Sequence, residues 1–498
     1  MKRRAFCASA VATLGIAALP FDRGYSAVTS VIADVQAITG DGKPVTLSRS
    51  DVEDLRASLR GQLLLPDTPG YDDARKIFNG MFDKRPALIA RCAGAADVVQ
   101  AVNFARAHSL LVAVRGGGHS LSGQSVCDKG LMIDLAGMRS VRVDTARKLA
   151  RAAGGALLGD VDRETIPFGL VTTTGTVSHT GAGGLTLGGG FGRLARRFGL
   201  TCDQVASADV VTSDGKLLQA SVDDNPDLFW AIRGGGGNFG VVTSFEYRLH
   251  AFDGNAVGGH IVYPLGQARD VLRGFAELFP QASDDLWIEP VLTRTPTGER
   301  VLVFDVCYTG VVAQAESALA PYRRLGKPLA DNVALVRYVK LQVQDDERAR
   351  IGGRYYTKSG FVTTIGPDLI DVAIETIAGA TVSRLRIAIP PKGGAVTRVA
   401  PDATAFWHRA APYSVILQTS GDEPAEDAAN IAWSKAHWPA LEAFTSGFYA
   451  NTNVSEIAAD RMREAYGGNY PRLQALKSQY DPTNLFRLNA NVKPPSRA

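Results

Sequence analysis

The sequence predicts a protein of the α+β class, in which short strands and helices share one chain. Between residues 86 and 250, apolar runs of strand length alternate with segments of helical periodicity. Between about 251 and 449, strand-like runs are mixed with longer helical stretches. The chain also carries 52 glycines, and they cluster in the first of these regions. Because glycine lets a backbone approach a ligand closely, the clusters indicate a binding site there.

The first region begins with segments that predict strands around a helix. The strands are expected at 87–90, 110–114 and 131–134, and the helix at 95–108. In this helix Val98, Val102 and Ala105 share one face, which is typical of a helix that packs against a sheet. Asp214-Gly215 lies between two apolar runs and predicts a hairpin.

The remaining elements follow from the same reasoning. Residues 225–232 predict a short helix, because Pro226 falls at its first position. Further strands are expected at 301–306 and 413–418, and helices at 313–324 and 425–445. The last segment predicts a helix from about residue 457, followed by Tyr480-Asp481-Pro482-Thr483-Asn484.

Composition is that of an ordinary globular protein and excludes some functions. The 498 residues are 45% hydrophobic and 21% charged, a length that corresponds to about two to four domains. A net charge of +4 without a basic stripe argues against nucleic-acid binding. The cysteines are Cys7, Cys92, Cys127, Cys202 and Cys307. They form no C-x-x-C pair, so no metal site is predicted, and disulfide pairing stays open.

The N-terminus has the pattern of an export signal. Lys2-Arg3-Arg4 precedes an apolar run from Cys7 to Leu19, which is shorter than a membrane span. Paired arginines favour the twin-arginine route, with a general secretory signal as the alternative. We assign residues 1–27 to this signal and expect a periplasmic or extracellular protein. No later run reaches spanning length, so no membrane association is expected.

Glycine clusters at 115–123, 175–192 and 234–240 predict an anion-binding site. Successive N–H groups can turn onto one anion such as a pyrophosphate, although a single cluster could also be a flexible turn. Residues 235–240 match G-x-G-x-x-G, but a strand-like run follows where a dinucleotide-binding motif needs a helix. Residues 190–195 fit the relaxed motif and follow no clear strand. An NAD site is therefore not expected.

These clusters carry a resemblance to a known family. Arg115-Gly116-Gly117-Gly118-His119-Ser120 with Gly123 resembles the pyrophosphate loop of the berberine bridge enzyme-like branch of the vanillyl-alcohol oxidase flavoprotein superfamily. The similarity continues at 183–192, 199–203, 233–241, 480–482 and 489–491. It extends from about residue 86 to residue 494, with the motifs in the family's order.

The resemblance implies a two-lobed FAD-binding domain of the PCMH type, and a central substrate domain with an antiparallel sheet covered by helices. The implied divisions are the signal at 1–27, an N-terminal extension at 28–85, the FAD-binding domain at 86–250, the substrate-binding domain at 251–456 and a C-terminal segment at 457–498. The N-terminal extension joins the flavin domain, and the C-terminal segment completes the FAD site.

The resemblance also implies that FAD is bonded covalently to His119, whose neutral imidazole supplies the nucleophile. Many members form a second bond through a cysteine, and the aligned residue here is Val177. We therefore expect a single covalent link. The residues expected to bind FAD are Arg115, Gly116, Gly117, Gly118, His119, Ser120, Gly123, Gln124, Asp134, Gly175, Thr176, Thr180, Gly181, Gly183, Gly184, Gly188, Gly189, Gly192, Asp203, Val241, Asn489 and Asn491.

Catalytic residues follow from the same comparison. Tyr449 lies in a segment that resembles a Tyr-x-Asn motif of the family, and it is the first candidate for the base that takes the hydroxyl proton. A packed tyrosine is the alternative, since a free phenol has a pKa of about 10. Thr452 replaces a second tyrosine of that motif, which weakens the assignment.

Further candidates lie on the strand expected at 413–418. Gln418 shares a face with Ile416, which aligns with a Gln or Glu of the family, and Tyr413 supplies another hydroxyl. Thr180 aligns with a position near the reactive face of the flavin, where a small residue favours reaction with oxygen.

The sequence thus predicts an FAD-dependent oxidase that oxidises a hydroxyl group of a sugar or secondary metabolite and reduces oxygen to hydrogen peroxide. The alternatives are a dehydrogenase with another electron acceptor, and a flavin-binding protein whose reactive residues have decayed. The expected partners are a small-molecule substrate and oxygen, without metal, nucleic acid or membrane. The oligomeric state stays open.

Overall fold

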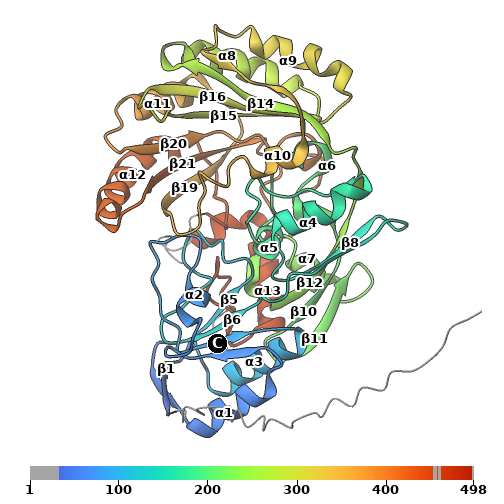
Figure 1. The fold of residues 1–498 in the computed structure, drawn as a ribbon, viewed down its shortest axis with the longest axis vertical. Helices are drawn as coiled ribbons and strands as arrows, with labels where there is room; N and C mark the ends of the chain where they lie inside the picture. Colours follow the sequence, from blue (N-terminus) through green and yellow to red (C-terminus); the bar gives the residue numbers. More distant parts are fainter. Residues whose placement is uncertain (1–32, 453–456, 458–460, 496–498) are drawn as a thin grey trace, which may run out of the picture.

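The computed structural model of the chain describes residues 33–452, 457 and 461–495. The α+β class predicted from the sequence is confirmed, because the strands form separate sheets against which helices pack (Figure 1). The signal expected at residues 1–27 lies outside the described residues.

One sheet has the strand order β3-β4-β6-β5, and β4 and β5 both run parallel to β6. Its strands are β3 (Gln62–Leu64), β4 (Leu88–Arg91), β5 (Val112–Arg115) and β6 (Leu131–Asp134). Helix α3 (Ala95–Ala107) connects β4 to β5 and buries Val98, Val102 and Ala105, as predicted. Strand β5 begins at Val112, later than expected, and leads directly into Gly116.

Besides β3, the chain before β4 forms a hairpin and two helices beside this sheet. These elements are β1 (Val35–Ile38), β2 (Pro44–Leu47), α1 (Arg49–Ser58) and α2 (Tyr71–Arg75). Helix α1 packs on α3, and α2 packs on β4.

A second sheet has the order β11-β10-β12-β8-β7 and is antiparallel throughout. Its strands are β7 (Val141–Asp144), β8 (Leu149–Ala153), β10 (Val205–Val211), β11 (Leu217–Ser221) and β12 (Val241–Arg248). The predicted hairpin is confirmed as β10 and β11, and Gly215 in its turn has a φ of +81°. Because α3 also contacts β10 and β12, this helix lies between the two sheets.

Short elements connect the strands of the second sheet. The helices are α4 (Leu158–Thr165), α5 (Ala182–Leu187), α6 (Ala195–Phe198) and α7 (Pro226–Ala231), and the two small strands β9 (Leu170–Val171) and β13 (His250–Ala251) pair with each other. Helix α7 is the helix expected at 225–232, with Pro226 in its first turn. Helix α5 lies within the second glycine cluster.

A third sheet has the order β17-β14-β16-β15-β20-β21-β19, and β18 also pairs with β14. Its strands are β14 (Asn255–Pro264), β15 (Leu286–Arg294), β16 (Arg300–Tyr308), β17 (Ala330–Asp331), β18 (Ala334–Arg337), β19 (Arg354–Val362), β20 (Arg384–Ala388) and β21 (Tyr413–Gly421). The associated helices are α8 (Ala268–Leu278), α9 (Ala315–Arg323), α10 (Tyr338–Val343), α11 (Pro367–Ala378) and α12 (Asp427–Glu442).

The two faces of this third sheet have different roles. Helices α8, α9, α11 and α12 cover one face and share its apolar core (Figure 1). On β21, Leu417 belongs to this core, so Ile416 and Gln418 point to the opposite face. Arg193, from just after the second glycine cluster, donates to Asp305 of β16 at 2.8 Å. The uncovered face is therefore turned toward the glycine clusters.

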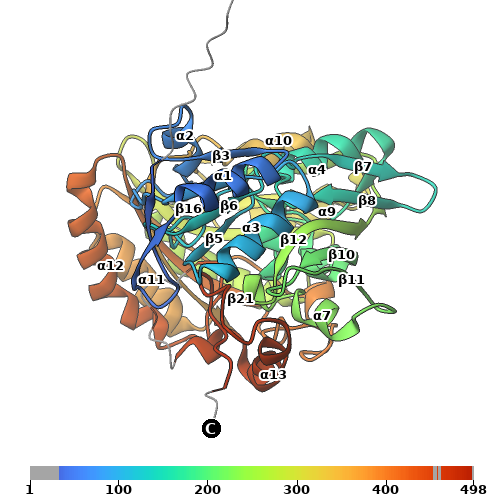
Figure 2. The ribbon, with the colours of Figure 1, turned by 90° about the horizontal axis from the view of Figure 1, so that it is seen from below.

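The C-terminal segment returns to the glycine clusters. Helix α13 (Tyr470–Tyr480) packs against α7, and the two lie side by side in Figure 2. The Lys477 Nζ forms an ion pair of 2.7 Å with Asp481, and both side chains are fully buried. The same Nζ donates to the carbonyl of Asn238 at 2.8 Å and to that of Phe486 at 3.0 Å. These bonds hold the tail beside the third glycine cluster.

The helix expected from about residue 457 begins later than predicted. Within the described part of this segment, Arg461–Ala465 and Gly467–Asn469 form 3₁₀ turns before α13. Gly467 has a φ of +48°, and a Cβ there would lie 2.0 Å from the Trp407 ring. The left-handed glycine thus breaks the helix where Trp407 packs against the backbone.

Candidate active site

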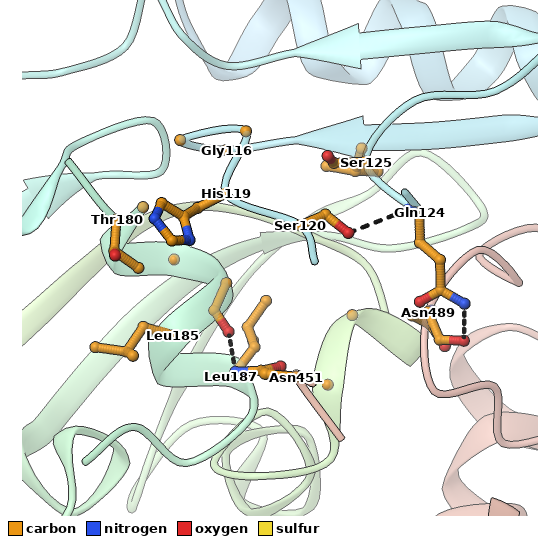
Figure 3. A pocket seen from close by; sticks show the side chains of 18 of the residues that line it. Gly116, His119, Ser120, Gln124, Ser125, Thr180, Leu185, Leu187, Asn451 and Asn489 are labelled. Carbon is orange, nitrogen blue, oxygen red and sulfur yellow. Dashed lines mark hydrogen bonds between the residues drawn. The ribbon is translucent and has the colours of Figure 1, made fainter. Parts of the chain in front are cut away.

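A cavity of about 400 Å³ lies where the glycine clusters meet the C-terminal tail. The first cluster contributes residues 116–118 after β5, the second contributes 181 and 183–184 at α5, and the third contributes 236–237. Residues 449–452 and the tail complete the wall (Figure 3). Segments from distant parts of the chain therefore build one site.

The first two clusters meet by direct backbone contact. A Cβ on Gly117 would lie 2.4 Å from the Gly181 Cα, and a Cβ on Gly181 would lie 2.5 Å from the Gly117 nitrogen. No side chain fits at either position. Gly118 also requires glycine, because its φ is +71°.

Polar contacts connect the first cluster to the tail. The Ser120 hydroxyl accepts a hydrogen bond from the Gln124 N–H at 3.1 Å, and the Gln124 amide donates to the Asn489 carbonyl at 3.0 Å (Figure 3). In the described part of the chain, Ser125 Oγ, Asn489 Oδ1 and Asn491 Oδ1 are buried without a hydrogen-bond partner. Buried polar atoms are rarely left unpaired, so Ser125 and Asn489, which line the cavity, are suited to a polar ligand.

His119 lies in the cavity wall with its ring held by aromatic stacking. Its ring packs on Phe78 with centroids 3.7 Å apart, and Phe78 packs on Tyr355 of β19 with centroids 4.6 Å apart. Burial, assisted by the nearby His179 ring, lowers the pKa of His119 from 6.5 to about 3. The His119 Nε2 has no hydrogen-bond partner among the described residues. The imidazole is therefore neutral at physiological pH, with a nitrogen free to react.

Val177 lies in the same wall and packs against the cluster of Phe78, Ala349 and Tyr355. The cysteines of the described chain are Cys92, Cys127, Cys202 and Cys307, and all are buried and free. Burial raises the pKa of each thiol, to about 12 for Cys127 and Cys307, and none belongs to the cavity wall. No thiol of the described residues therefore joins His119 in the cavity.

Tyr449 forms another part of the wall, together with Asn451. The Asn451 amide donates to the Tyr449 hydroxyl at 2.9 Å and to the Gly184 carbonyl at 3.1 Å. Burial raises the pKa of Tyr449 well above its usual 10. The side chain is therefore a neutral phenol at physiological pH.

Comparison with known proteins identifies the family. A family model described as FAD binding domain matches residues 86–221, and one described as Berberine and berberine like matches residues 448–493. The (R)-6-hydroxynicotine oxidase of Paenarthrobacter nicotinovorans is 32% identical over 461 residues, which cover 88% of this chain and 97% of the relative. The chain belongs to the berberine bridge enzyme-like family. It is an FAD-linked oxidoreductase, as the sequence predicted.

Other relatives agree with this assignment. An FAD-linked oxidoreductase of Dictyostelium discoideum is 32% identical over 411 residues, covering 82% of this chain and 89% of the relative. The crystal structure of 6-hydroxy-D-nicotine oxidase from Arthrobacter nicotinovorans superposes with a TM-score of 0.81 at 30% identity, covering 88% of this chain and 99% of the other. A chitooligosaccharide oxidase has a TM-score of 0.80 at 25% identity, with coverage of 90% and 100%.

The site of this berberine bridge enzyme-like protein fits FAD by its own geometry. Glycine backbone without side chains lines the cavity, and polar atoms in its wall have no hydrogen-bond partner among the described residues. A Cβ built on Gly184 would meet no atom within 4 Å, so it would enter the cavity itself. A side chain at residue 184 would take up part of the space that a bulky cofactor needs.

Many of the residues expected to bind FAD line the cavity. They are Gly116, Gly117, Gly118, His119, Ser120, Gln124, Gly175, Thr176, Thr180, Gly181, Gly183, Gly184, Val241 and Asn489. Tyr449, the first catalytic candidate, also lines it.

The other expected FAD ligands lie outside the cavity wall. They are Arg115, Gly123, Asp134, Gly188, Gly189, Gly192, Asp203 and Asn491. The fully buried Asp134 lies 3.3 Å from Arg91 and 3.7 Å from Arg115. Both oxygens of Asp203 accept hydrogen bonds from Arg409 at 2.7 Å. These carboxylates therefore stabilise the loops around the site through ion pairs outside the cavity wall.

The catalytic candidates on β21 do not reach the cavity wall. Gln418 lies on the uncovered face, and its amide donates to the Thr357 hydroxyl at 3.0 Å. Tyr413 lies on the opposite face, in the core beneath the helices, with its ring 6.5 Å from that of Phe279. The alternation of side chains along β21 separates the two residues.

Lys392 is a buried base near the cavity that sequence reasoning missed. Its side chain is fully buried, and its Nζ has no hydrogen-bond partner in the described chain. The Nζ lies 3.6 Å from the centroid of the Phe361 ring and 5.4 Å from that of Phe191, which lines the cavity. Burial lowers the pKa of Lys392 well below 10.5. Only the fold reveals this lysine, because its apolar neighbours come from other segments.

We predict that Gly184→Val reduces FAD binding without unfolding the protein. The added side chain would enter the cavity space and not the protein core. Overpacking typically costs about 1–3 kcal/mol, so the flavin-to-protein absorbance ratio should fall about tenfold when FAD is limiting. Gly266→Val is the matched control, because a Cβ on this exposed glycine also meets no atom within 4 Å. Equal flavin content in both variants would contradict the cavity assignment.

We predict that Lys392→Met stabilises the protein at neutral pH, by about 1–3 kcal/mol, because it removes a buried polar group without a partner. The amine has a lower pKa folded than unfolded, so the unfolded state binds more protons and wild-type stability rises with pH toward 10.5. The advantage of the variant should therefore shrink between pH 7 and pH 9.

The free energy of unfolding in urea measures this effect. Lys216→Met is the control, because the Lys216 side chain is 72% exposed. A pH-independent difference between Lys392→Met and wild type would show that Lys392 is charged in the folded state.

Proposed function

We propose that this protein is an oxidase that removes a hydride from a hydroxyl-bearing carbon of a sugar or secondary metabolite and reduces oxygen to hydrogen peroxide. The observation that carries the proposal is His119, a neutral imidazole with an unpartnered nitrogen in the wall of the cavity. Two relatives support it by name, since one is an oxidase of 6-hydroxynicotine and the other of chitooligosaccharide.

The residues that would hold FAD have distinct roles. FAD, when bound, supplies the hydride acceptor and transfers the electrons to oxygen. The glycine clusters would present backbone N–H groups to the pyrophosphate, and Ser125 and Asn489 would offer polar atoms to the cofactor. His119 would form the covalent bond, and Val177, which carries no thiol, would not form a second one. The cofactor is therefore attached through a single link.

Tyr449 and Asn451 bind the substrate hydroxyl. The raised pKa of Tyr449 keeps it protonated, so it acts as a hydrogen-bonding group and not as a strong base. Asn451 fixes the phenol through its 2.9 Å bond, which leaves the phenolic proton available to the substrate. Thr180 lies in the cavity wall, where its small side chain would leave room for oxygen.

We also propose that the protein is exported, and that the twin-arginine export system recognises its signal at residues 1–27. The paired arginines at positions 3 and 4 and the short apolar run after them support this route. In the described part of the chain, no helix combines the length and apolarity needed to cross a bilayer.

We predict that acid precipitation leaves the yellow chromophore bound to the wild-type protein and releases it from His119→Ala. The covalent bond survives denaturation, whereas contacts with the glycine loops do not. The measurement is flavin absorbance in the pellet and supernatant. Colour that stays with both proteins would place the bond elsewhere, and release from the wild type would exclude a covalent bond.

We predict that a sugar or phenolic alcohol bleaches the flavin without oxygen, and that air restores the colour with formation of hydrogen peroxide. Tyr449→Phe removes the hydroxyl that binds substrate, so bleaching should slow by about tenfold or more, as expected when a hydrogen bond to a reacting group is lost. Bleached flavin that air leaves unchanged would favour a dehydrogenase. Wild-type flavin that no substrate of these classes bleaches would contradict the proposed oxidase.

A further inference from the structure

His179 lies beside His119 and makes no polar contact within the described chain. The two ring centroids are 5.2 Å apart, and the Phe78 ring that stacks on His119 is 5.9 Å from the His179 ring. Both nitrogens of His179 are shielded from solvent, and neither has a hydrogen-bond partner. His179 directly precedes Thr180, which Figure 3 shows next to His119.

This arrangement is unusual for a histidine that serves only packing. A neutral imidazole carries one N–H and one lone pair, and buried polar atoms are nearly always paired. The carboxylate of Asp346 binds the neighbouring residue Ser178 and not His179. It accepts hydrogen bonds from the Ser178 backbone N–H at 2.8 Å and from the Ser178 hydroxyl at 2.5 Å. Ser178 thus binds the carboxylate, and His179 is left with a free lone pair.

The position of this lone pair matters for cofactor attachment. Any carbon that bonds to His119 must come within bonding distance of its ring, whose centroid lies 5.2 Å from that of His179. The flavin edge that carries the methyl group is a hydrocarbon and offers no hydrogen bond to His179. The His179 ring would therefore keep an unbonded nitrogen lone pair beside the place where a C–H bond has to break.

We propose that His179 is the proton acceptor when FAD becomes attached to His119, an inference that rests on the single link proposed above. A methyl C–H bond of the flavin breaks, and its proton passes to a nitrogen of His179. A C–N bond forms to His119, which loses its own proton. Dioxygen takes the two electrons and two protons that the reaction releases, and hydrogen peroxide forms. His179 then returns to its neutral state.

The test measures the rate of attachment in flavin-free protein produced under riboflavin limitation. After FAD is added, acid-stable flavin is followed over time in wild type, His179→Ala and His179→Gln. General base catalysis contributes about 10²–10⁴-fold, so both variants should attach FAD at least about tenfold more slowly while still binding it. Imidazole in solution should restore part of the rate in His179→Ala, which a packing role would not allow.

His437→Ala is the control, because this histidine lies on α12 and stacks on Trp433. It should attach FAD at the wild-type rate. The glutamine variant keeps a polar side chain without the basic nitrogen, so it tests the proposal even where alanine disturbs folding. Attachment at the wild-type rate in His179→Gln would overturn the role of His179 and leave the link to His119 intact. Absence of acid-stable flavin in the wild type would overturn both.

Discussion

The cofactor cavity depends on one steric constraint, the backbone contact between Gly117 and Gly181. A Cβ at either position would overlap the other backbone, at 2.4 Å and 2.5 Å from its nearest atoms. This contact joins the loop after β5, which belongs to the parallel sheet, to the start of α5 in the antiparallel lobe. The two lobes can therefore approach closely only where both segments of the chain have glycine, and the cavity forms beside that point.

The Lys477–Asp481 ion pair closes the other side of the cavity. Both groups are fully buried, and the lysine also binds carbonyls of Asn238 and Phe486. Because a buried ion pair loses much of its Coulombic gain to desolvation, such a pair contributes more to geometry than to stability. Here it fixes the tail against the third glycine cluster, so that Asn489 can meet Gln124 of the first.

Local sequence patterns predicted much of this site, but the contacts that depend on long-range packing could not be predicted from them. The glycine clusters and helix α3 follow from short stretches of sequence, and their residues line or support the cavity. The stack in which Phe78 packs between His119 and Tyr355 could not be predicted in this way. It depends on how β19 packs against the segments that carry Phe78 and His119, which are far away in the sequence. Strand alternation separates Gln418 from Tyr413, but only the packed sheet shows which face meets the glycine clusters.

Val177 belongs to the surroundings of the same stack. It packs against the cluster that contains Phe78 and Tyr355, and so supports the ring that stacks on His119. The cavity region also keeps nitrogen bases without partners, since His119 Nε2, both His179 nitrogens and Lys392 Nζ are buried and unpaired in the described chain. Leaving such groups unpaired lowers stability. Departures from full pairing are expected where reactivity is needed. The two histidines lie beside Phe78, and Lys392 lies over the rings of Phe361 and Phe191.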